Sequence, residues 1–443
     1  MRIFEDIESA RTSLFMRSYS DTAQLPDHVT KRIREVFGED LSAEAVVDRI
    51  LQDIRNRGDE AVFEYTEKLD GIKIDKLEVS PEEFAAARGQ ADQTILASLQ
   101  LAAERIRDYH TRQVQSLPIG RTDFIPGLGQ MLAPIELVGV YAPGGTASYP
   151  STVLMTAIPA KAAGVDEVIL ATPAQADGHI SPLTLAAAEM AGIERVFAIG
   201  GAVAIGALAF GTESVPKVDK ICGPGNIFVM LAKKQVFGTA GIDGLQGPTE
   251  TVVLADESAS PVSCAADLLA QAEHDELSSA ILITPSKSLA EAVSDEVERQ
   301  LERLSRSRIA RKSLEKNGGI VVTRTMNEAI ELVNAYAPEH LCLLVADSEA
   351  VAPKIRHSGG IFIGESSPEV LGDYVAGPSH VMPTGGTARF SSPVNVLDFL
   401  KVTSRVELDE DSFKKLGPHA EAIARAEGLT AHAEAVRKRM NLE

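Results

Sequence analysis

The sequence predicts an α/β protein built on two similar parallel sheets. Short apolar segments of strand length alternate with segments of helical periodicity between about residues 135 and 345. Such alternation is typical of parallel sheets whose strands are joined by helices. Two of the apolar runs end in matching places, at Ala171-Thr-Pro and Ile283-Thr-Pro, which indicates a duplicated unit. We therefore expect two incomplete Rossmann-like domains, a helical N-terminal arm and a small C-terminal tail domain.

The first hundred or so residues are predicted to be helical. Ser42 precedes apolar residues at helical spacing, and Ser80 followed by Pro81 is typical of a helix start. A third helix is predicted from Asp92 to Gln115. Its apolar stripe comprises Leu96, Leu99, Ile106 and Tyr109.

The predicted strands and helices fall into two sets and a tail. In the first set, strands at 135–141, 168–171 and 196–199 accompany helices at 151–163, 181–191 and 227–235. In the second set, strands at 249–254, 280–283, 320–323 and 341–345 accompany helices at 261–273, 287–315 and 326–336. In the tail, short helices are predicted at 410–415 and 418–427, and a final helix from residue 430. The tail is too short to hold a core, so it should pack on another surface.

Composition excludes several classes of protein. A chain of 443 residues with 44% hydrophobic and 24% charged residues is typical of a globular protein of two or more domains. The net charge is -20 and the pI about 5.0, without a basic block, so we expect neither nucleic acid nor a membrane surface as partner. The three cysteines form no CxxC pair, which fits a reducing cytoplasm. The N-terminus carries no signal-like apolar stretch, and no apolar run reaches transmembrane length.

Four separate stretches supply polar residues that together could hold one metal ion. They are Gln271-Ala-Glu-His274, Glu339-His340, Asp373-Tyr-Val-Ala-Gly-Pro-Ser-His380 and Leu429-Thr-Ala-His432. Two imidazoles, a carboxylate and an amide oxygen can form a Zn²⁺ site that stays open to substrate. Taken singly, each has an ordinary explanation: Gln271 and His274 as a polar pair at a helix end, Asp373 as a loop carboxylate, and His432 as a surface histidine.

Glu339 and His340 stand directly before a predicted buried strand. Burying an acid and an imidazole is costly unless they have partners or a chemical task. Glu and His are also the usual general bases near neutral pH. The pair is therefore a candidate for proton transfer.

Two glycine-rich turns follow predicted strands. They are Tyr141-Ala-Pro-Gly-Gly-Thr146 and Cys222-Gly-Pro-Gly-Asn226, and the second precedes a predicted helix. Such turns let backbone amides approach phosphate oxygens near a helix N-terminus. Neither matches G-x-G-x-x-G, so each alone is explained equally well as an ordinary turn.

Taken together, these motifs resemble the histidinol dehydrogenase family over essentially the whole chain. The stretches that carry the resemblance are Gly139-Val-Tyr-Ala-Pro-Gly-Gly-Thr-Ala, Pro150-Ser-Thr-Val-Leu-Met155, Phe210-Gly-Thr-Glu-Ser-Val-Pro-Lys-Val-Asp-Lys220, Gly223-Pro-Gly-Asn226, Gly247-Pro-Thr-Glu250, Gln271-Ala-Glu-His274, Ala337-Pro-Glu-His340, Gly372-Asp-Tyr-Val-Ala-Gly-Pro-Ser-His-Val-Met-Pro-Thr384 and Leu429-Thr-Ala-His432. So many long motifs in one order are very improbable by chance.

The resemblance implies the last step of histidine biosynthesis, a four-electron oxidation of L-histidinol to L-histidine with two NAD⁺ through bound histidinaldehyde. It implies one Zn²⁺ per subunit on Gln271, His274, Asp373 and His432, a metal that orients the substrate rather than exchanging electrons. It implies that His340 takes the hydroxyl proton and that Glu339 activates water. The implied substrate contacts are Thr249, Gln271, His274, His340, Asp373, His380, Glu427 and His432, and the implied cofactor contacts are Tyr141 and Asn226.

The resemblance also implies a homodimer with shared active sites, in which the tail reaches the partner subunit. The expected domains are an arm at 1–35, a metal and substrate domain at 36–134 and 250–390, a cofactor domain at 135–249, and a tail at 391–443 that docks on the partner.

The sequence departs from the family pattern at three positions. Val203 stands where a cofactor-contacting Gln is common, and its side chain can form no hydrogen bond. Thr249 stands where Ser is common, and Ser379 where Asn is common. One cofactor contact is thereby lost, whereas the metal ligands and the Glu339-His340 pair are retained.

Three alternatives remain open at this point. A paralogue that oxidises another amino alcohol or a small diol would keep the same metal and proton-transfer residues. A zinc hydrolase would use Glu339 to activate water against an ester or amide. A non-catalytic metal-binding protein would close its site with four Cys or His ligands, which Gln271 does not match.

Overall fold

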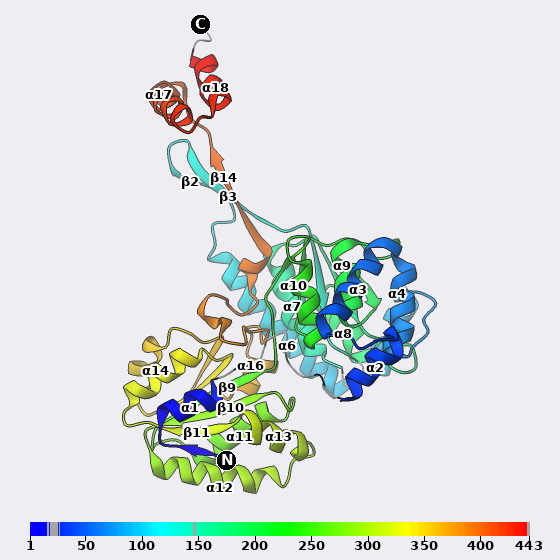
Figure 1. Ribbon diagram of the computed structural model, residues 1–443, viewed down its shortest axis with the longest axis vertical. Helices are drawn as coiled ribbons and strands as arrows, with labels where there is room; N and C mark the ends of the chain where they lie inside the picture. Colours follow the sequence, from blue (N-terminus) through cyan, green and yellow to red (C-terminus); the bar gives the residue numbers. More distant parts are fainter. Residues whose placement is uncertain (16, 18–24, 26, 145–147, 441–443) are drawn as a thin grey trace. The chain divides into compact units, whose positions relative to one another are not determined.

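The chain divides into two compact units, which are described separately below. The computed structural model describes residues 1–15, 17, 25, 27–144 and 148–440. Unit 1 comprises Met1–Gln113 and Ile135–Phe399, and unit 2 comprises Val114–Pro134 and Leu400–Glu443. Figure 1 shows the course of the chain and the element labels. No described helix is both long enough and apolar enough to cross a membrane.

A five-stranded parallel sheet forms one half of unit 1. Its order is β6-β5-β4-β7-β8. The strands are β4 (Leu137–Tyr141), β5 (Glu167–Thr172), β6 (Arg195–Ala198), β7 (Lys220–Cys222) and β8 (Gly241–Ile242). The predicted strands from residues 135, 168 and 196 are confirmed as β4, β5 and β6.

Helices cover both faces of this sheet. One face shares an apolar core with α2 (Asp27–Phe37), α3 (Ala43–Arg57), α4 (Asp59–Tyr65), α9 (Gly201–Phe210) and α10 (Ile227–Val236). Against the other face lie α7 (Pro150–Ala163) and α8 (Pro182–Ala191), and α5 (Pro81–Gln90) packs on α8. Helix α9 was not predicted, because its continuous apolar run has no helical periodicity.

The N-terminal helices begin where the sequence predicts. The Ser42 and Ser80 side chains cap α3 and α5 by accepting backbone N–H groups. Helix α4 continues into the π-helix η1 (Thr66–Asp70). Helix α6 (Gln93–Gln115) buries most of its predicted stripe, but Tyr109 is exposed and the neighbouring His110 is buried instead.

A six-stranded parallel sheet forms the other half of unit 1. Its order is β1-β11-β10-β9-β12-β13. The strands are β1 (Ile3–Phe4), β9 (Glu250–Ala255), β10 (Ser279–Thr284), β11 (Gly319–Val322), β12 (His340–Leu344) and β13 (Gly360–Ile363). Edge strand β1 comes from the predicted N-terminal arm.

Two groups of helices enclose the six-stranded sheet (Figure 1). Its first face packs on α11 (Pro261–Ala272), α12 (Lys287–Leu301) and α13 (Ser307–Asn317), and its second on α1 (Ile7–Leu14) and α14 (Met326–Tyr336). Shorter helices complete this half: α15 (Ser348–Val351), η2 (Ala352–Lys354), α16 (Glu369–Tyr374), η3 (Thr387–Arg389) and η4 (Val396–Phe399). The single helix predicted at 287–315 is wrong, because the chain turns between α12 and α13 so that both can bury apolar residues on one face.

The strand orders confirm the duplication. When the strands of each half are counted along the chain from β4 and from β9, both sheets have the order third, second, first, fourth, fifth. This is the doubly wound strand order without its sixth strand. It matches the incomplete Rossmann-like fold that the sequence predicts. Thr172-Pro173 and Thr284-Pro285 end the second strand of each sheet, β5 and β10.

Unit 2 joins a three-stranded antiparallel sheet to a helical pair. The sheet order is β14-β3-β2, with β2 (Gly120–Ile125), β3 (Leu128–Pro134) and β14 (Leu400–Val406). No strand was predicted here. The helices are α17 (Glu410–Ala426) and α18 (Thr430–Met440). The two helices predicted at 410–415 and 418–427 are one, because α17 continues through Pro418, and the adjacent Gly417 is buried against Met440 and Val436 of α18.

Candidate functional site

The predicted proton-transfer pair lies at the amino-terminal edge of the six-stranded sheet. Glu339 immediately precedes β12 and His340 is its first residue. They are only 7% and 3% exposed. Ala337, the C-cap of α14, has φ 53°, the only positive φ among the described non-glycine residues. This left-handed residue and Pro338 form the connection that carries the chain from α14 to Glu339.

The Glu339 carboxylate is held by the start of the neighbouring strand β9. Its Oε2 accepts a hydrogen bond of 2.5 Å from the Thr249 hydroxyl and one of 3.0 Å from the Glu250 N–H. Both donors approach the same oxygen. The carboxylate is therefore fixed in orientation, while its other oxygen takes no part in these bonds.

His340 lies among groups from three elements. Its Nε2 is 3.1 Å from Asp373 Oδ1, and its Nδ1 is 2.8 Å from Gln271 Nε2. Nδ1 also lies 3.3 Å from the Glu250 carbonyl oxygen and 3.4 Å from Glu339 Oε2. Burial opposes a positive charge on the ring, but the carboxylates of Glu339 and Asp373 outweigh it and raise the pKa of His340 well above its ordinary value.

The predicted metal ligands of unit 1 come from two helices. Gln271 is in the last turn of α11 and is 1% exposed, and His274 follows the end of that helix. Asp373 was predicted in a loop, which is wrong: it is part of the short helix α16. Burial opposes the negative charge of Asp373, but His340 outweighs it and, with His380 and His274, lowers the pKa of Asp373.

His380 adjoins the same group of residues. Its Nδ1 lies 2.6 Å from the Asp373 carbonyl oxygen, and its Nε2 lies 3.3 Å from Thr152 Oγ1 on α7. Burial lowers the pKa of His380 below its ordinary value. The Ser379 hydroxyl donates to the Met155 carbonyl, a second link from this segment to α7.

Glu427 and His432 belong to unit 2. Glu427 is the C-cap of α17, His432 lies in the first turn of α18, and both are exposed. Within the described residues, no three His, Cys, Asp or Glu side chains come close enough together to hold a metal ion. Of the predicted ligands, unit 1 supplies one imidazole, one carboxylate and one amide.

The predicted cofactor residues lie at the carboxyl-terminal edge of the five-stranded sheet. Tyr141 ends β4, and its hydroxyl accepts the Gly201 N–H at 3.1 Å. Asn226 follows β7 and caps α10, its Oδ1 accepting the N–H groups of Phe228 and Val229. Val203 is 3% exposed in the core between α9 and α3. Gly145 and Thr146 of the first glycine-rich turn lie outside the described residues.

A buried ion pair holds the second glycine-rich turn. Lys233 and Asp243 are fully buried against each other. Lys233 Nζ donates to the Gly223 carbonyl at 2.9 Å and to Gln246 Oε1 at 2.8 Å, and Asp243 Oδ2 accepts the Gly223 N–H at 2.8 Å. Gly223 has φ 125°, and a Cβ there would clash with the Tyr141 carbonyl. The pair therefore fixes both backbone groups of a glycine beside the predicted cofactor residues.

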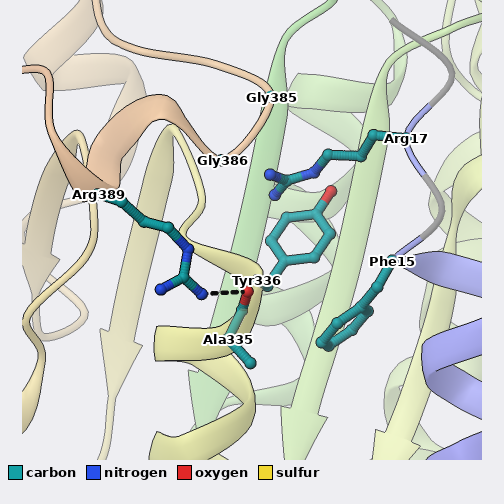
Figure 2. Close-up of a pocket in the computed structure, with 7 residues that line it drawn as sticks. All are labelled: Phe15, Arg17, Ala335, Tyr336, Gly385, Gly386 and Arg389. Atoms are coloured by element: carbon teal, nitrogen blue, oxygen red, sulfur yellow. Dashed lines mark hydrogen bonds between the residues drawn. The ribbon is translucent and has the colours of Figure 1, made fainter. Parts of the chain in front are cut away.

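A pocket of about 500 Å³ adjoins the start of β9 (Figure 2). Figure 2 shows the Arg17 guanidinium against the ring of Tyr336, 3.7 Å from its centroid. Arg17 Nε is also 3.0 Å from Glu250 Oε1, which accepts the Gly385 N–H as well. Arg389 donates to the Ala335 carbonyl on the opposite wall. The pocket thus connects the arm to the residue whose backbone contacts both Glu339 and His340.

Sequence reasoning missed one further group of polar residues. Thr251, Asp267, Cys342 and Glu369 are all buried, next to the residues described above. A signal was present in the spacing. Each lies two residues along a strand, or four along a helix, from a predicted site residue, so each shares its face.

Comparisons with known proteins agree with this geometry. The family model described as histidinol dehydrogenase matches residues 34–440. The histidinol dehydrogenase of Dehalococcoides mccartyi (strain ATCC BAA-2266 / KCTC 15142 / 195) is 56% identical over 400 residues, 90% of this chain and 91% of that protein. That of Deinococcus radiodurans is 48% identical over 447 residues, 99% of this chain and 100% of that protein.

A solved structure is similar over nearly the whole chain. The crystal structure of histidinol dehydrogenase from Elizabethkingia anophelis has a TM-score of 0.88 and 34% sequence identity, covering 99% of this chain and 98% of that one. Family model, curated relatives and solved structure therefore agree: the chain belongs to the histidinol dehydrogenase family.

Proposed function

We propose that this protein oxidises L-histidinol to L-histidine in two successive NAD-dependent steps, the last step of histidine biosynthesis. The chain is an NAD-dependent oxidoreductase of the histidinol dehydrogenase family. The observation that carries the assignment of roles is the position of His340, between the Gln271 amide and the Asp373 carboxylate and beside Glu339. One site thus combines a base, a carboxylate for water and residues able to hold a metal.

His340 would accept the alcohol proton of the substrate while hydride leaves the same carbon for NAD⁺. Two acceptors lie near its Nδ1, the Glu250 carbonyl and Glu339 Oε2. Once Gln271 and Asp373 turn from the ring to the metal, these acceptors would keep a proton on Nδ1 and leave Nε2 as the basic nitrogen. The product of this first oxidation is histidinaldehyde. It would stay bound, so that a reactive aldehyde does not escape.

Glu339 would take a proton from the water that adds to the aldehyde. Its Oε2 already accepts two hydrogen bonds, so Oε1 is the oxygen available to the water. The hydrate then loses a second hydride to a second NAD⁺, with His340 again accepting the hydroxyl proton. The overall change, from alcohol to carboxylate, removes four electrons and consumes one water.

The donor set of unit 1 fits a zinc ion. Gln271 and Asp373 flank the His340 ring, each in contact with one of its nitrogens, and His274 acts electrostatically on Asp373. We assign the fourth ligand to His432, which would bring one more imidazole to this set of three. If the Gln271 amide rotates so that its Oε1 faces the metal, its N–H groups leave His340 Nδ1, which keeps the Glu250 carbonyl and Glu339 Oε2 as acceptors. The zinc, one per subunit, would supply orientation and charge stabilisation for the imidazole and amino nitrogens of histidinol.

We assign the remaining substrate contacts to Thr249, His380 and Glu427. Because Glu427 and His432 lie on the helical pair of unit 2, we propose a homodimer in which each tail completes the partner's site. Nothing in the composition favours nucleic acid or a membrane as a further partner. All three cysteines are free and buried, which agrees with a reducing, cytoplasmic location.

For NAD we assign the carboxyl-terminal edge of the five-stranded sheet. Asn226 uses its Oδ1 to cap α10, which leaves its amide N–H groups for the cofactor. Tyr141 is positioned by its bond to Gly201. Val203 offers no polar group, so affinity at that position would come from backbone donors.

The experiment is a count of the NADH formed at 340 nm per L-histidinol consumed by zinc-loaded protein. We expect about two NADH per histidinol, and loss of activity after chelation that zinc restores. If histidinol yields no NADH but another amino alcohol or a diol does, the substrate assignment would change to that compound. Ester cleavage that needs no cofactor, without NADH formation from any alcohol, would refute the assigned dehydrogenase activity.

A further inference from the structure

A second set of polar side chains lies directly beneath the predicted site. The set, called here the lower layer, repeats the site one step deeper on each element. Its members are Thr251 behind Thr249 at β9, Cys342 behind His340 on β12, Asp267 behind Gln271 on α11, and Glu369 behind Asp373 on α16. Exposure in the lower layer ranges from 0% to 7%, so none of these groups is solvated.

Glu369 is the centre of the lower layer. Its Oε2 accepts a hydrogen bond of 2.7 Å from the Thr251 hydroxyl and lies 3.5 Å from the Cys342 thiol. Its Oε1 is buried and has no hydrogen-bond partner among the described residues. A neutral carboxylic acid fits this arrangement, because its C=O can accept both donors while Oε1 carries the proton.

Burial of Glu369 favours the same neutral state, and the charges around it act in both directions. Asp373 on its own helix and Asp267 on α11 favour the neutral acid, whereas His340 on β12 and the Thr251 hydroxyl on β9 favour the carboxylate. The Cys342 thiol also faces Glu369 from β12. Two of the four titratable groups that face Glu369 are carboxyls, so burial decides its state. A carboxylate that is 1% exposed pays a large desolvation cost, and burial raises the pKa of Glu369 to about 8.

We propose that Glu369 is a positioning residue of the active site that acts as an uncharged carboxylic acid beneath Asp373 and His340. The proposal rests on the function proposed above. Thr251 ties Glu369 to β9, and Glu369 lies one turn before Asp373 on α16. The bond therefore sets how close α16 lies to the sheet, and with it the 3.1 Å between Asp373 and His340 Nε2.

A pair of variants in the full-length, zinc-loaded enzyme separates this role from simple packing. Glu369→Leu keeps the volume but removes the acceptor for Thr251, and we expect kcat to fall about tenfold or more. Glu369→Gln keeps an uncharged acceptor, and we expect it to restore kcat to within about threefold of the unchanged enzyme. Glu369→Gln should also hold its activity above pH 8, where ionisation of Glu369 reduces that of the unchanged enzyme. A folded, zinc-loaded Glu369→Gln enzyme as poor as Glu369→Leu would show that the charge is needed and would overturn the proposal.

A second measurement needs no stable variant. Infrared spectra of the zinc-loaded enzyme at neutral pH should contain the C=O stretch of a protonated carboxylic acid, which disappears on raising the pH above 8. Absence of that band at neutral pH overturns the proposal. An unchanged enzyme that shows the band but does not oxidise histidinol would refute the proposed function alone, so the two failures are distinguishable.

Discussion

The Thr249 hydroxyl donates to the Glu339 carboxylate across the starts of two adjacent strands, with 2.5 Å between the oxygens. Ninety residues separate the two along the chain. The register of β9 against β12 brings them together, because His340 pairs with Thr251. A hydroxyl just before one strand thereby orients the carboxylate that we assign to water activation.

Removing this hydroxyl tests the orientation of Glu339. Thr249→Val keeps the shape and deletes the donor, and a hydrogen bond to a charged group is worth about 1.5–3 kcal/mol. We expect kcat to fall by about tenfold to a hundredfold. Thr249→Ser is the matched control, because it keeps the hydroxyl and should stay within about threefold. Equal kcat values for the Val and Ser variants, measured as NADH formation, would contradict the role.

His340→Asn tests whether His340 is the base rather than a zinc ligand. We expect zinc content measured by atomic absorption to stay at one per subunit, because none of the assigned ligands changes, while turnover is lost. Loss of zinc together with turnover would reassign His340 to the metal.

The sharing of sites between subunits has its own test. His432→Ala should lower zinc content, and mixing it with His340→Asn subunits should restore activity, since the two defects would then occupy different sites. Mixed dimers that remain inactive would indicate that each tail serves its own subunit.

The buried Lys233–Asp243 pair should contribute to both stability and cofactor binding. Lys233→Met leaves an uncompensated buried carboxylate, which costs about 3–5 kcal/mol, and frees the Gly223 backbone. We expect a lower urea midpoint and a raised KM for NAD. Arg112→Ala, which breaks the exposed pair with Asp108, is the control and should cost under about 1 kcal/mol. If both variants lose similar stability and show similar KM values for NAD, the Lys233–Asp243 pair does not have this role.

Asp267 gives the lower layer a predictable pH dependence. Burial raises its pKa to about 6 in the folded protein, from 3.8. The folded state therefore holds this proton more tightly than the unfolded state, and the associated stability is lost as pH rises from about 4 through about 6. The Asn side chain in Asp267→Asn does not titrate. The free energy of unfolding of this variant, relative to that of the unchanged protein, should therefore rise by up to about 3 kcal/mol as pH increases from about 4 to above 6. Urea titrations at both pH values, with exposed Asp166→Asn as control, measure the effect. A pH-independent difference would mean that Asp267 does not titrate there.

Much of unit 1 was predictable because its elements carry local signals. The Ser42 cap, the Ser80-Pro81 start and the alternating apolar runs place helices and strands within a few residues of where they lie. The misses have physical causes. The break between α12 and α13 follows from packing both helices on one sheet face, and α17 passes through Pro418 because α18 packs against it. The antiparallel sheet of unit 2 pairs β3 with a strand more than 250 residues away, which no local pattern reveals.

The sequence by itself determined the fold class, the duplication and the family, because these depend on periodicity and on long contiguous motifs. It also identified Glu339 and His340 as candidates for proton transfer, because burying such groups is costly unless they have partners or a chemical task. Only the tertiary structure decided which oxygen of Glu339 is held, that Asp373 belongs to a helix, and that Glu369 lies beneath it with one oxygen bound by Thr251. Thr251 and Glu369 are 118 residues apart. Such contacts depend on strand register and helix packing, which arise only when distant segments condense around a common core.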